Sequence, residues 1–229
     1  MRIFFGNLFC KSVLTCVGLS VLMMALSKTA NGQIIEWQST GSGFWTGGNI
    51  FELNVVNPLG VRVSEFSYQL RGDEATRSYA VWHRVGAHDE VIDELPVHRI
   101  EEEWTQIATA EDLSFTSTTA HPFAVDLTLA AGLHSIYFAT TASTGSNNGL
   151  RSTEVDNIGT GDVFAFDSNL ELVVAGSKGS AFGTTIPANN GRTPGNLTIQ
   201  YQVIPEPSTG IILLGLTLVG CLSRRRLQR

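Results

Sequence analysis

The densest group of residues capable of chemistry is a run of imidazoles and carboxylates in the first half of the chain. Its members are His83, His88, Asp89, Glu90, Asp93, Glu94 and His98. Metal binding and acid–base catalysis both use such groups. The spacing contains no HExxH pattern and no EF-hand order, and a strand histidine can simply be packed or exposed. We therefore predict no metal and no cofactor, with a calcium-binding acidic loop as the alternative.

A second polar group consists of Asp156, Asn157 and Asp162, close to Gly159 and Gly161. In sandwich lectins such loops hold calcium or hydrogen-bond to sugar hydroxyls. Asp and Asn side chains also cap their own backbone in ordinary turns, which is their commoner use. Ligand binding and turn formation both stay open for this group.

The chain lacks the motifs of a covalent catalyst or a phosphate-binding loop. It contains no G-x-S-x-G, and the glycine-rich segment 41–48 lacks the Gly-Lys-Ser/Thr ending. The tryptophans are Trp37, Trp45, Trp82 and Trp104. Their rings could stack on sugars or pack in a core. We expect no catalytic residue and no enzyme; the alternatives are a carbohydrate-binding module or, less favoured, a glycan hydrolase with paired carboxylates.

Strands must position these groups, because no window shows an apolar stripe at helical spacing. Residues 197–203 alternate apolar and polar side chains, as in a strand with one buried face. Residues 125–129 and 133–140 predict a hairpin turning at Ala131-Gly132. Further strands are predicted at residues 50–56, 61–70, 78–85, 162–166 and 170–174. The pattern predicts an all-β fold, an antiparallel, jelly-roll-like β-sandwich.

Two stretches interrupt the strand pattern. Residues 87–104 are acidic, and residues 142–157 are rich in Ser, Thr, Asn and Gly. We predict that both are long exposed loops, where binding functions commonly lie. Segments such as 61–66 and 79–86 resemble β-sandwich domains of secreted, surface-sorted bacterial proteins. That resemblance implies the fold and no enzymatic activity.

The charge of the central region is strongly acidic. Residues 33–203 hold twenty of the 21 acidic residues and eight of the 15 basic ones. This charge argues against nucleic acid and anionic lipid as partners, because phosphate binding needs clustered Lys and Arg. An acidic surface suits solubility, divalent cations or a sugar matrix.

The N-terminal end reads as a signal peptide over residues 1–32. Arg2 and Lys11 precede or border an apolar core at 12–26, and Ala30 and Gly32 are small residues before the expected cut. Cysteines occur at Cys10, Cys16 and Cys221. None lies in the domain at 33–203, so we predict that it folds without disulfides.

The C-terminal segment 204–229 combines three features in a fixed order. Pro205, Glu206 and Pro207 form a triplet that favours extended backbone. Residues 208–223 would span roughly 24 Å as a helix, short of a ~30 Å hydrocarbon core. The basic cluster Arg224, Arg225 and Arg226 follows the apolar run 211–222 as a stop signal, and we predict a single transmembrane helix there.

This segment resembles the PEP-CTERM sorting signal of secreted bacterial proteins. The resemblance implies that an exosortase, a membrane protease or transpeptidase, cuts near the triplet and releases the product or joins it to the surface or matrix. The alternative is a plain anchor that is never cut. We therefore expect an exported, non-catalytic envelope or extracellular-matrix protein, transiently anchored in the inner membrane, with extracellular polysaccharide as a further partner.

Overall fold

Extended strands account for most of the chain that the structure describes. The computed structural model describes residues 32–39, 42–144, 148–155, 158–178, 182 and 192–206. These residues form a seven-stranded sheet, a six-stranded sheet and a two-stranded ribbon, and every strand pair is antiparallel. The all-β prediction is confirmed.

The strands of the first sheet are β1 (Gln33–Gln38), β2 (Ser42–Thr46), β4 (Val61–Leu70), β9 (Thr119–Leu129), β11 (Leu150–Glu154), β14 (Thr193–Pro194) and β15 (Asn196–Val203). Those of the second sheet are β3 (Gly48–Val55), β5 (Arg77–Val85), β8 (Thr105–Leu113), β10 (Gly132–Ser143), β12 (Val163–Phe166) and β13 (Leu170–Lys178). The ribbon consists of β6 (Val91–Ile92) and β7 (Leu95–Pro96), followed by the 3₁₀ turns η1 (Val97–Arg99) and η2 (Glu101–Glu103).

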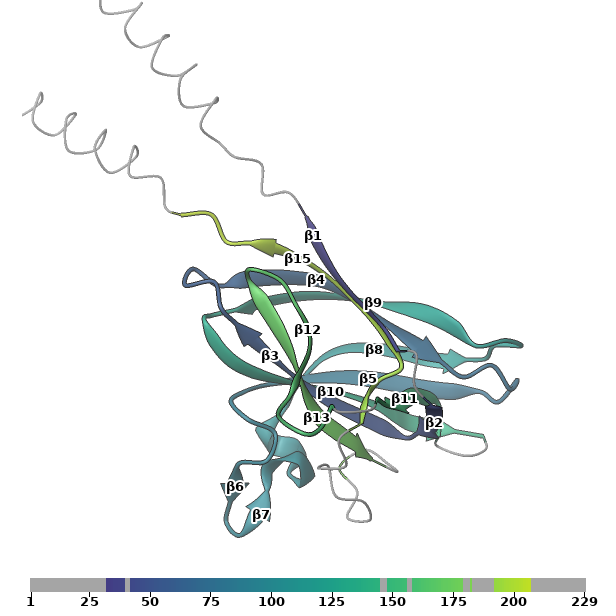
Figure 1. Ribbon diagram of the computed structural model, residues 1–229. Coiled ribbons are helices and arrows are strands. Elements are labelled where there is room, and N and C mark those ends of the chain that lie inside the picture. The colour runs from purple at the N-terminus through teal and green to yellow at the C-terminus, as the bar shows by residue number, and fades with distance from the viewer. Residues whose placement is uncertain are drawn as a thin grey trace, which may run out of the picture. The chain divides into compact units, whose positions relative to one another are not determined.

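The order of the strands is that of a jelly roll. In the first sheet β15 lies between β1 and β4, and β9 pairs with the other edge of β4. In the second sheet β3, β10, β5 and β8 are neighbours in that order. The chain therefore crosses between the sheets from β3 to β4 to β5, and again from β8 to β9 to β10 (Figure 1). This arrangement confirms the prediction of a jelly-roll-like sandwich.

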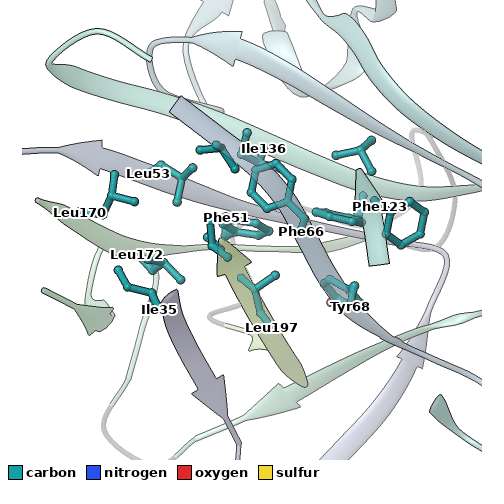
Figure 2. Close-up of a cluster of buried hydrophobic side chains, with 14 of the residues drawn as sticks. Ile35, Phe51, Leu53, Phe66, Tyr68, Phe123, Ile136, Leu170, Leu172 and Leu197 are labelled. Atoms are coloured by element: carbon teal, nitrogen blue, oxygen red, sulfur yellow. The ribbon is translucent and has the colours of Figure 1, made fainter. Parts of the chain in front are cut away.

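The two sheets enclose an aromatic core. Phe138 of β10 stacks on Phe51 of β3 with ring centres 6.0 Å apart. It meets the edges of Phe66 and Phe123, from the opposite sheet, at 5.8 and 5.4 Å. Figure 2 shows Phe51, Phe66 and Phe123 converging between the layers. Each such ring buries a large apolar area, so packing alone can stabilise the sandwich without disulfides.

A β-bulge in β4 keeps both halves of that strand on the core. Gln200 and Tyr201 are consecutive in β15, but their partners in β4 are Glu65 and Val63, so Ser64 is the extra residue of a bulge. Without the bulge, strict alternation would send Val63 and Phe66 to opposite faces. Both are fully buried in the core.

The predicted hairpin between residues 125–129 and 133–140 is wrong. Both segments are strands, but β9 pairs with β4 whereas β10 pairs with β3 and β5. The link through Ala131 and Gly132 is a corner between the two sheets. A short glycine-containing connection between amphipathic strands suits either geometry, so the local sequence could not distinguish them.

The prediction that the acidic stretch 87–104 is an exposed loop is wrong for part of its residues. The stretch folds into a covering lobe, defined as residues 87–104, over the outer face of the second sheet. Trp104 packs against Tyr137 with ring centres 5.7 Å apart, and its indole N–H donates to the Val97 carbonyl at 3.0 Å. Both Val97 and Trp104 are buried, whereas the acids at 101–103 stay exposed. The lobe thus covers a second cluster of buried apolar side chains on the outer face of the second sheet.

The prediction of an exposed loop at 142–157 is also wrong for part of that range. Residues 150–154 form β11, whose Ser152 and Thr153 are buried. The Asn49 side-chain amide donates to the Ser152 hydroxyl at 3.0 Å. A strand whose buried positions are polar lacks the apolar alternation that sequence patterns detect.

Most of each terminal signal lies outside the described residues, which include only Gly32 of the first and residues 204–206 of the second. The signal peptide at 1–32, of which only Gly32 is described, and the transmembrane helix at 211–222 therefore stay predictions, as do the boundaries of the 33–203 domain. Within the part of the chain that is described, no helix has the length and apolar character needed to cross a membrane.

Candidate functional site

The sorting triplet begins where the last strand leaves its sheet. The Ile204 N–H still donates to the Gly60 carbonyl at 3.3 Å. Pro205 has no N–H with which to continue the ladder, and both Pro205 and Glu206 are exposed. The chain therefore becomes free of backbone pairing and accessible at the first residue of the triplet, which is what proteolytic cutting requires.

The first strand begins beside this exit. Gln33 of β1 pairs with Tyr201 of β15, and Gly32 is exposed. Because β1 and β15 are antiparallel, the start of one lies next to the end of the other (Figure 1). The expected cut before Gln33 and the triplet beginning at Pro205 therefore belong to the same end of the sandwich.

A buried asparagine joins these two strands to the rest of the fold. The Asn169 side-chain amide donates to the Gln33 side-chain oxygen at 2.8 Å and to the Tyr201 hydroxyl at 3.3 Å. Its own oxygen accepts from the Asn57 amide at 2.9 Å. Asn169 lies in the turn between β12 and β13, so four separate parts of the chain meet at one side chain.

Asp167 supports this asparagine from the same turn. Its carboxylate accepts the backbone N–H of Asn169 at 2.7 Å and that of Leu170 at 3.0 Å. The Tyr201 hydroxyl also donates to it. Burial, and then this hydrogen bond, raise the pKa of Tyr201, so its hydroxyl stays protonated. We name Gln33, Asn57, Asp167, Asn169 and Tyr201 the terminal clamp.

Sequence reasoning identified the triplet and missed the terminal clamp. Of the six sorting-signal residues, Pro205 and Glu206 are described, whereas Pro207, Arg224, Arg225 and Arg226 lie outside the described residues. The Asp-Ser-Asn turn at 167–169 was a visible signal. Its partners are as many as 136 positions away along the chain, so the turn alone did not identify them.

The histidines of the acidic run make structural contacts within the fold. The ring of His83 is 3.1 Å from that of His134, nitrogen to nitrogen. His88 donates its backbone N–H to the buried Glu52 carboxylate at 2.9 Å, and its ring lies 2.8 Å from the same oxygen. His98 contacts the His88 carbonyl at 3.2 Å. No described group of three or more His, Cys, Asp or Glu side chains could hold a metal ion.

His83 is held in its neutral form. Burial, and then the neighbouring imidazole of His134, lower the pKa of His83 to about 4. A neutral imidazole can both donate and accept a hydrogen bond, which suits the pairing with His134. The nearby Glu90 carboxylate forms an ion pair with Arg84 instead of joining the histidines.

In the second polar group, Asp162 completes a turn. Its carboxylate accepts a hydrogen bond from the Gly159 N–H at 2.8 Å, and the Asp162 N–H donates to the Gly159 carbonyl at 3.1 Å. This is the turn role of an Asx side chain. Asp156 and Asn157 lie outside the described residues.

None of the four tryptophans is fully exposed. Trp82 of β5 and Trp104 of the covering lobe are buried in one apolar cluster. Trp37 packs edge-on against Phe164 at 5.2 Å. Trp45 is half-buried, with the guanidinium groups of two arginines 5.4 and 5.6 Å from its ring centre. An exposed tryptophan platform for sugar stacking is therefore absent from these four residues.

Comparison with known protein families identifies the C-terminal segment. Residues 203–226 match the family model described as the PEP-CTERM protein-sorting motif. The match starts at the last residue of β15 and extends through the triplet and the apolar run to Arg226. The chain thus carries the signal of an exported, envelope-associated protein that an exosortase, a membrane enzyme, processes.

Comparisons of the whole chain with curated proteins and solved structures identify no relative that informs its function. No curated protein matches the sequence. A chain from "Structure of infectious bursal disease virus Gx strain" is similar over 78% of this chain and 36% of its own, at 8% identity and a TM-score of 0.23. A Gt-strain chain of the same virus is similar over 89% of this chain and 49% of its own, at 11% identity and a TM-score of 0.19. Scores this low carry no argument about fold or function.

Proposed function

We propose that this protein is a non-catalytic component of the cell envelope or extracellular matrix, whose β-sandwich is separated from both terminal signals by processing. The PEP-CTERM motif supplies the premise of export and exosortase targeting. The observation that carries the proposal is that β1 begins beside the end of β15, so the two expected processing points share one position. Both belong to one end of the sandwich, one before Gln33 and one from Pro205 onward.

Cuts at these two points leave the folded ladder complete. A cut before Gln33 keeps every pair of β1 with β15, and a cut within residues 205–207 keeps every pair of β15 with β4. The terminal clamp also lies wholly inside the product. Because no strand is lost, the product retains the packing and hydrogen bonds that stabilise the sandwich.

The non-catalytic role is supported by how the candidate catalytic groups are used. Among the candidate groups of the acidic run, the His88 backbone N–H donates to the buried Glu52 carboxylate, and the Glu90 carboxylate pairs with Arg84. These contacts tie loops to the sheets. Groups fully engaged in structural contacts are poor candidates for general acids or bases, which must reach a substrate.

Before processing, the tail would hold the sandwich at the inner membrane. The apolar run 211–222 would enter the bilayer, and Arg224, Arg225 and Arg226 would stay on the cytoplasmic side. The described sandwich continues without a gap from β15 to Glu206. Only a short spacer would then separate the sandwich from the bilayer.

Mass spectrometry of the protein recovered from envelope and medium tests the proposal. We expect an N-terminus at Gln33 and a C-terminus within residues 205–207, and an intact tail when the exosortase gene is deleted. Glu206→Ala should also accumulate the uncut form, while Glu111→Ala, an exposed acid far from the triplet, should be processed normally. A mature C-terminus at Arg229 in cells that contain exosortase would falsify the processing scheme.

Polysaccharide binding is the second candidate function. The observation that favours it is the pair of guanidinium groups stacked on Trp45. A glycan array read with and without calcium separates this function from a purely structural one. Binding to any glycan would favour the second candidate, and a calcium requirement would point to the acidic loops.

A further inference from the structure

We propose that, before the tail is cut, the processed end of the sandwich contacts the lipid bilayer through apolar side chains beside the exit of β15. We name Val56, Pro58, Leu59 and Ile204 the apolar rim. The inference rests on the proposed function, because it assumes that the tail anchors the protein in a membrane. It adds a lipid-contacting surface to that function.

The apolar rim is assembled around Gly60. Residues 56–59 belong to the loop between β3 and β4, and the Ile204 N–H donates to the Gly60 carbonyl at 3.3 Å. A Cβ added to Gly60 would lie 3.3 Å from Cδ1 of Ile204 and 2.3 Å from the Leu129 carbonyl oxygen. The loop therefore lies against both the exit of β15 and the corner that joins β9 to β10.

The side chains of the apolar rim are accessible from outside the fold. Val56 is 49% exposed and Leu59 is 36% exposed, while Pro58 is exposed and Ile204 is half-buried. Single exposed apolar side chains are common on protein surfaces. What distinguishes these four is their position beside the residue at which the predicted membrane anchor leaves the sandwich.

The backbone N–H groups of the loop are paired within the fold. Those of Val56 and Asn57 donate to the Asn169 carbonyl at 2.8 and 3.3 Å. That of Leu59 donates to the Asn57 side-chain oxygen at 2.9 Å, and that of Gly60 donates to the Asn57 carbonyl at 3.0 Å. The proline at position 58 has no N–H. A loop whose N–H groups are all paired can enter the apolar edge of a bilayer without losing the hydrogen bonds of those groups.

The turns at this end carry a single charge. Segments 56–60, 129–133 and 166–170 contain one charged residue, Asp167. Its carboxylate accepts hydrogen bonds from the Tyr201 hydroxyl and from two backbone N–H groups. In a domain with twenty acidic and eight basic residues, such an end suits the edge of a zwitterionic bilayer better than contact with anionic headgroups.

The length of the tail brings this end within reach of the lipid headgroups. Residues 208–223 would span roughly 24 Å as a helix, about 6 Å less than the ~30 Å hydrocarbon core. A span that is too short draws the residues before it toward the bilayer. Ile204 lies four residues before Ser208, a distance of at most about 14 Å in extended chain. The headgroup layer covers about 5–7 Å of that distance.

Lipid quenching of the uncut full chain tests the inference. The chain is purified from cells that lack the exosortase and reconstituted in phosphatidylcholine vesicles that contain brominated phosphatidylcholine, after its native cysteines have been changed to serine. A fluorophore is attached through Ala131→Cys, in the corner beside Gly60, or through Thr118→Cys. Thr118 is exposed and precedes Thr119, which pairs with Leu70 at the opposite end of β4. We expect quenching of the label at position 131 and none at position 118.

Two matched double variants separate lipid contact from simple tethering. Val56→Asp combined with Leu59→Asp should abolish quenching of the label at position 131, because a carboxylate is costly to bring into the apolar edge of a bilayer. Val91→Asp combined with Leu95→Asp is the control, since these side chains are 64% and 49% exposed on the β6–β7 ribbon. The control should be quenched as strongly as the parent chain. Thermal melting establishes that each variant is folded.

Each other outcome overturns the inference. An unquenched label at position 131, in a chain that floats with the vesicles, would show that the sandwich stands clear of the lipid while the anchor holds. Quenching that survives the change of Val56 and Leu59 would show that the tether alone brings this end close. Cross-linking of position 131 to exosortase in cell membranes, without quenching in vesicles, would assign the rim to the enzyme. A chain that does not float would remove the anchor itself, and with it the membrane step of the proposed function.

Discussion

Gln33 and Tyr201 face each other across the β1–β15 ladder, and the buried Asn169 amide hydrogen-bonds to both side chains. The residue that would begin the processed protein is thus fixed to the strand that ends at the sorting motif. Strand ends normally fray, because their last pairs lack neighbours. Here a side chain from the β12–β13 turn secures both ends, which suits the proposed removal of the segments beyond them.

Asn169→Ala should destabilise the sandwich by about 2 kcal/mol, since it removes the hydrogen bonds to the Gln33 and Asn57 side chains and one of the two at the Tyr201 hydroxyl. For a domain of this size that corresponds to a fall in melting temperature of roughly 4–8 °C. Asn54→Ala is the matched control, because Asn54 makes one half-buried side-chain contact, to Glu171 at 2.7 Å. Equal melting temperatures for the two variants would contradict the role of the clamp.

Gly60→Ala should destabilise the protein more than Gly132→Ala does. Both glycines have positive φ, +84° and +120°, which strains any residue with a Cβ. At Gly60 the new Cβ would also lie 2.3 Å from the Leu129 carbonyl oxygen, whereas at Gly132 it meets open space. We expect about 1–2 kcal/mol of strain at Gly132 and a distinctly larger loss at Gly60. Urea denaturation measures both, and an inverted order would contradict the geometry.

Asp73→Asn should remove an acid-sensitive part of the stability. The hydrogen bonds from the buried Arg77 lower the pKa of Asp73 to about 2 from the ordinary 3.8. A lowered carboxyl pKa stabilises the fold above about pH 4, and that stabilisation is lost as the pH falls toward 2. The variant should therefore be less stable by about 2 kcal/mol at pH 7, and the difference should shrink below pH 4.

Asp126→Asn is the control for this prediction. Asp126 forms an ion pair with Arg62 in which both side chains are well exposed, 71% and 59%. Exposed pairs contribute little in water. A loss at Asp126 as large as that at Asp73 would show that burial of Arg77 does not determine the effect.

His83→Gln should flatten the stability profile in mild acid. The pKa of His83 is about 4 in the folded protein, against an ordinary value of 6.5. Between pH 6.5 and pH 4, His83 binds a proton in the unfolded chain but stays neutral in the folded chain. The free energy of unfolding therefore falls as the pH drops through this range. Urea midpoints at pH 7, 5.5 and 4.5 should decline less steeply in the variant. Parallel declines in both proteins would show that His83 does not contribute.

The sequence by itself determined the local features of this protein. Alternating side chains located most of the long strands, such as 61–70 and 197–203, because one buried face imposes a period of two on any strand. The order of triplet, apolar run and arginines identified the sorting motif, because a linear signal is recognised through residues that are neighbours in the chain.

Only the tertiary structure decided which distant residues meet. It placed β9 and β10 in opposite sheets, gathered Gln33, Asn169 and Tyr201 at one end, and laid Arg151 between Gly43 and Gly195 at the other. Such contacts depend on strand order. Strand order follows from how two whole sheets bury their apolar faces together, which no local pattern encodes.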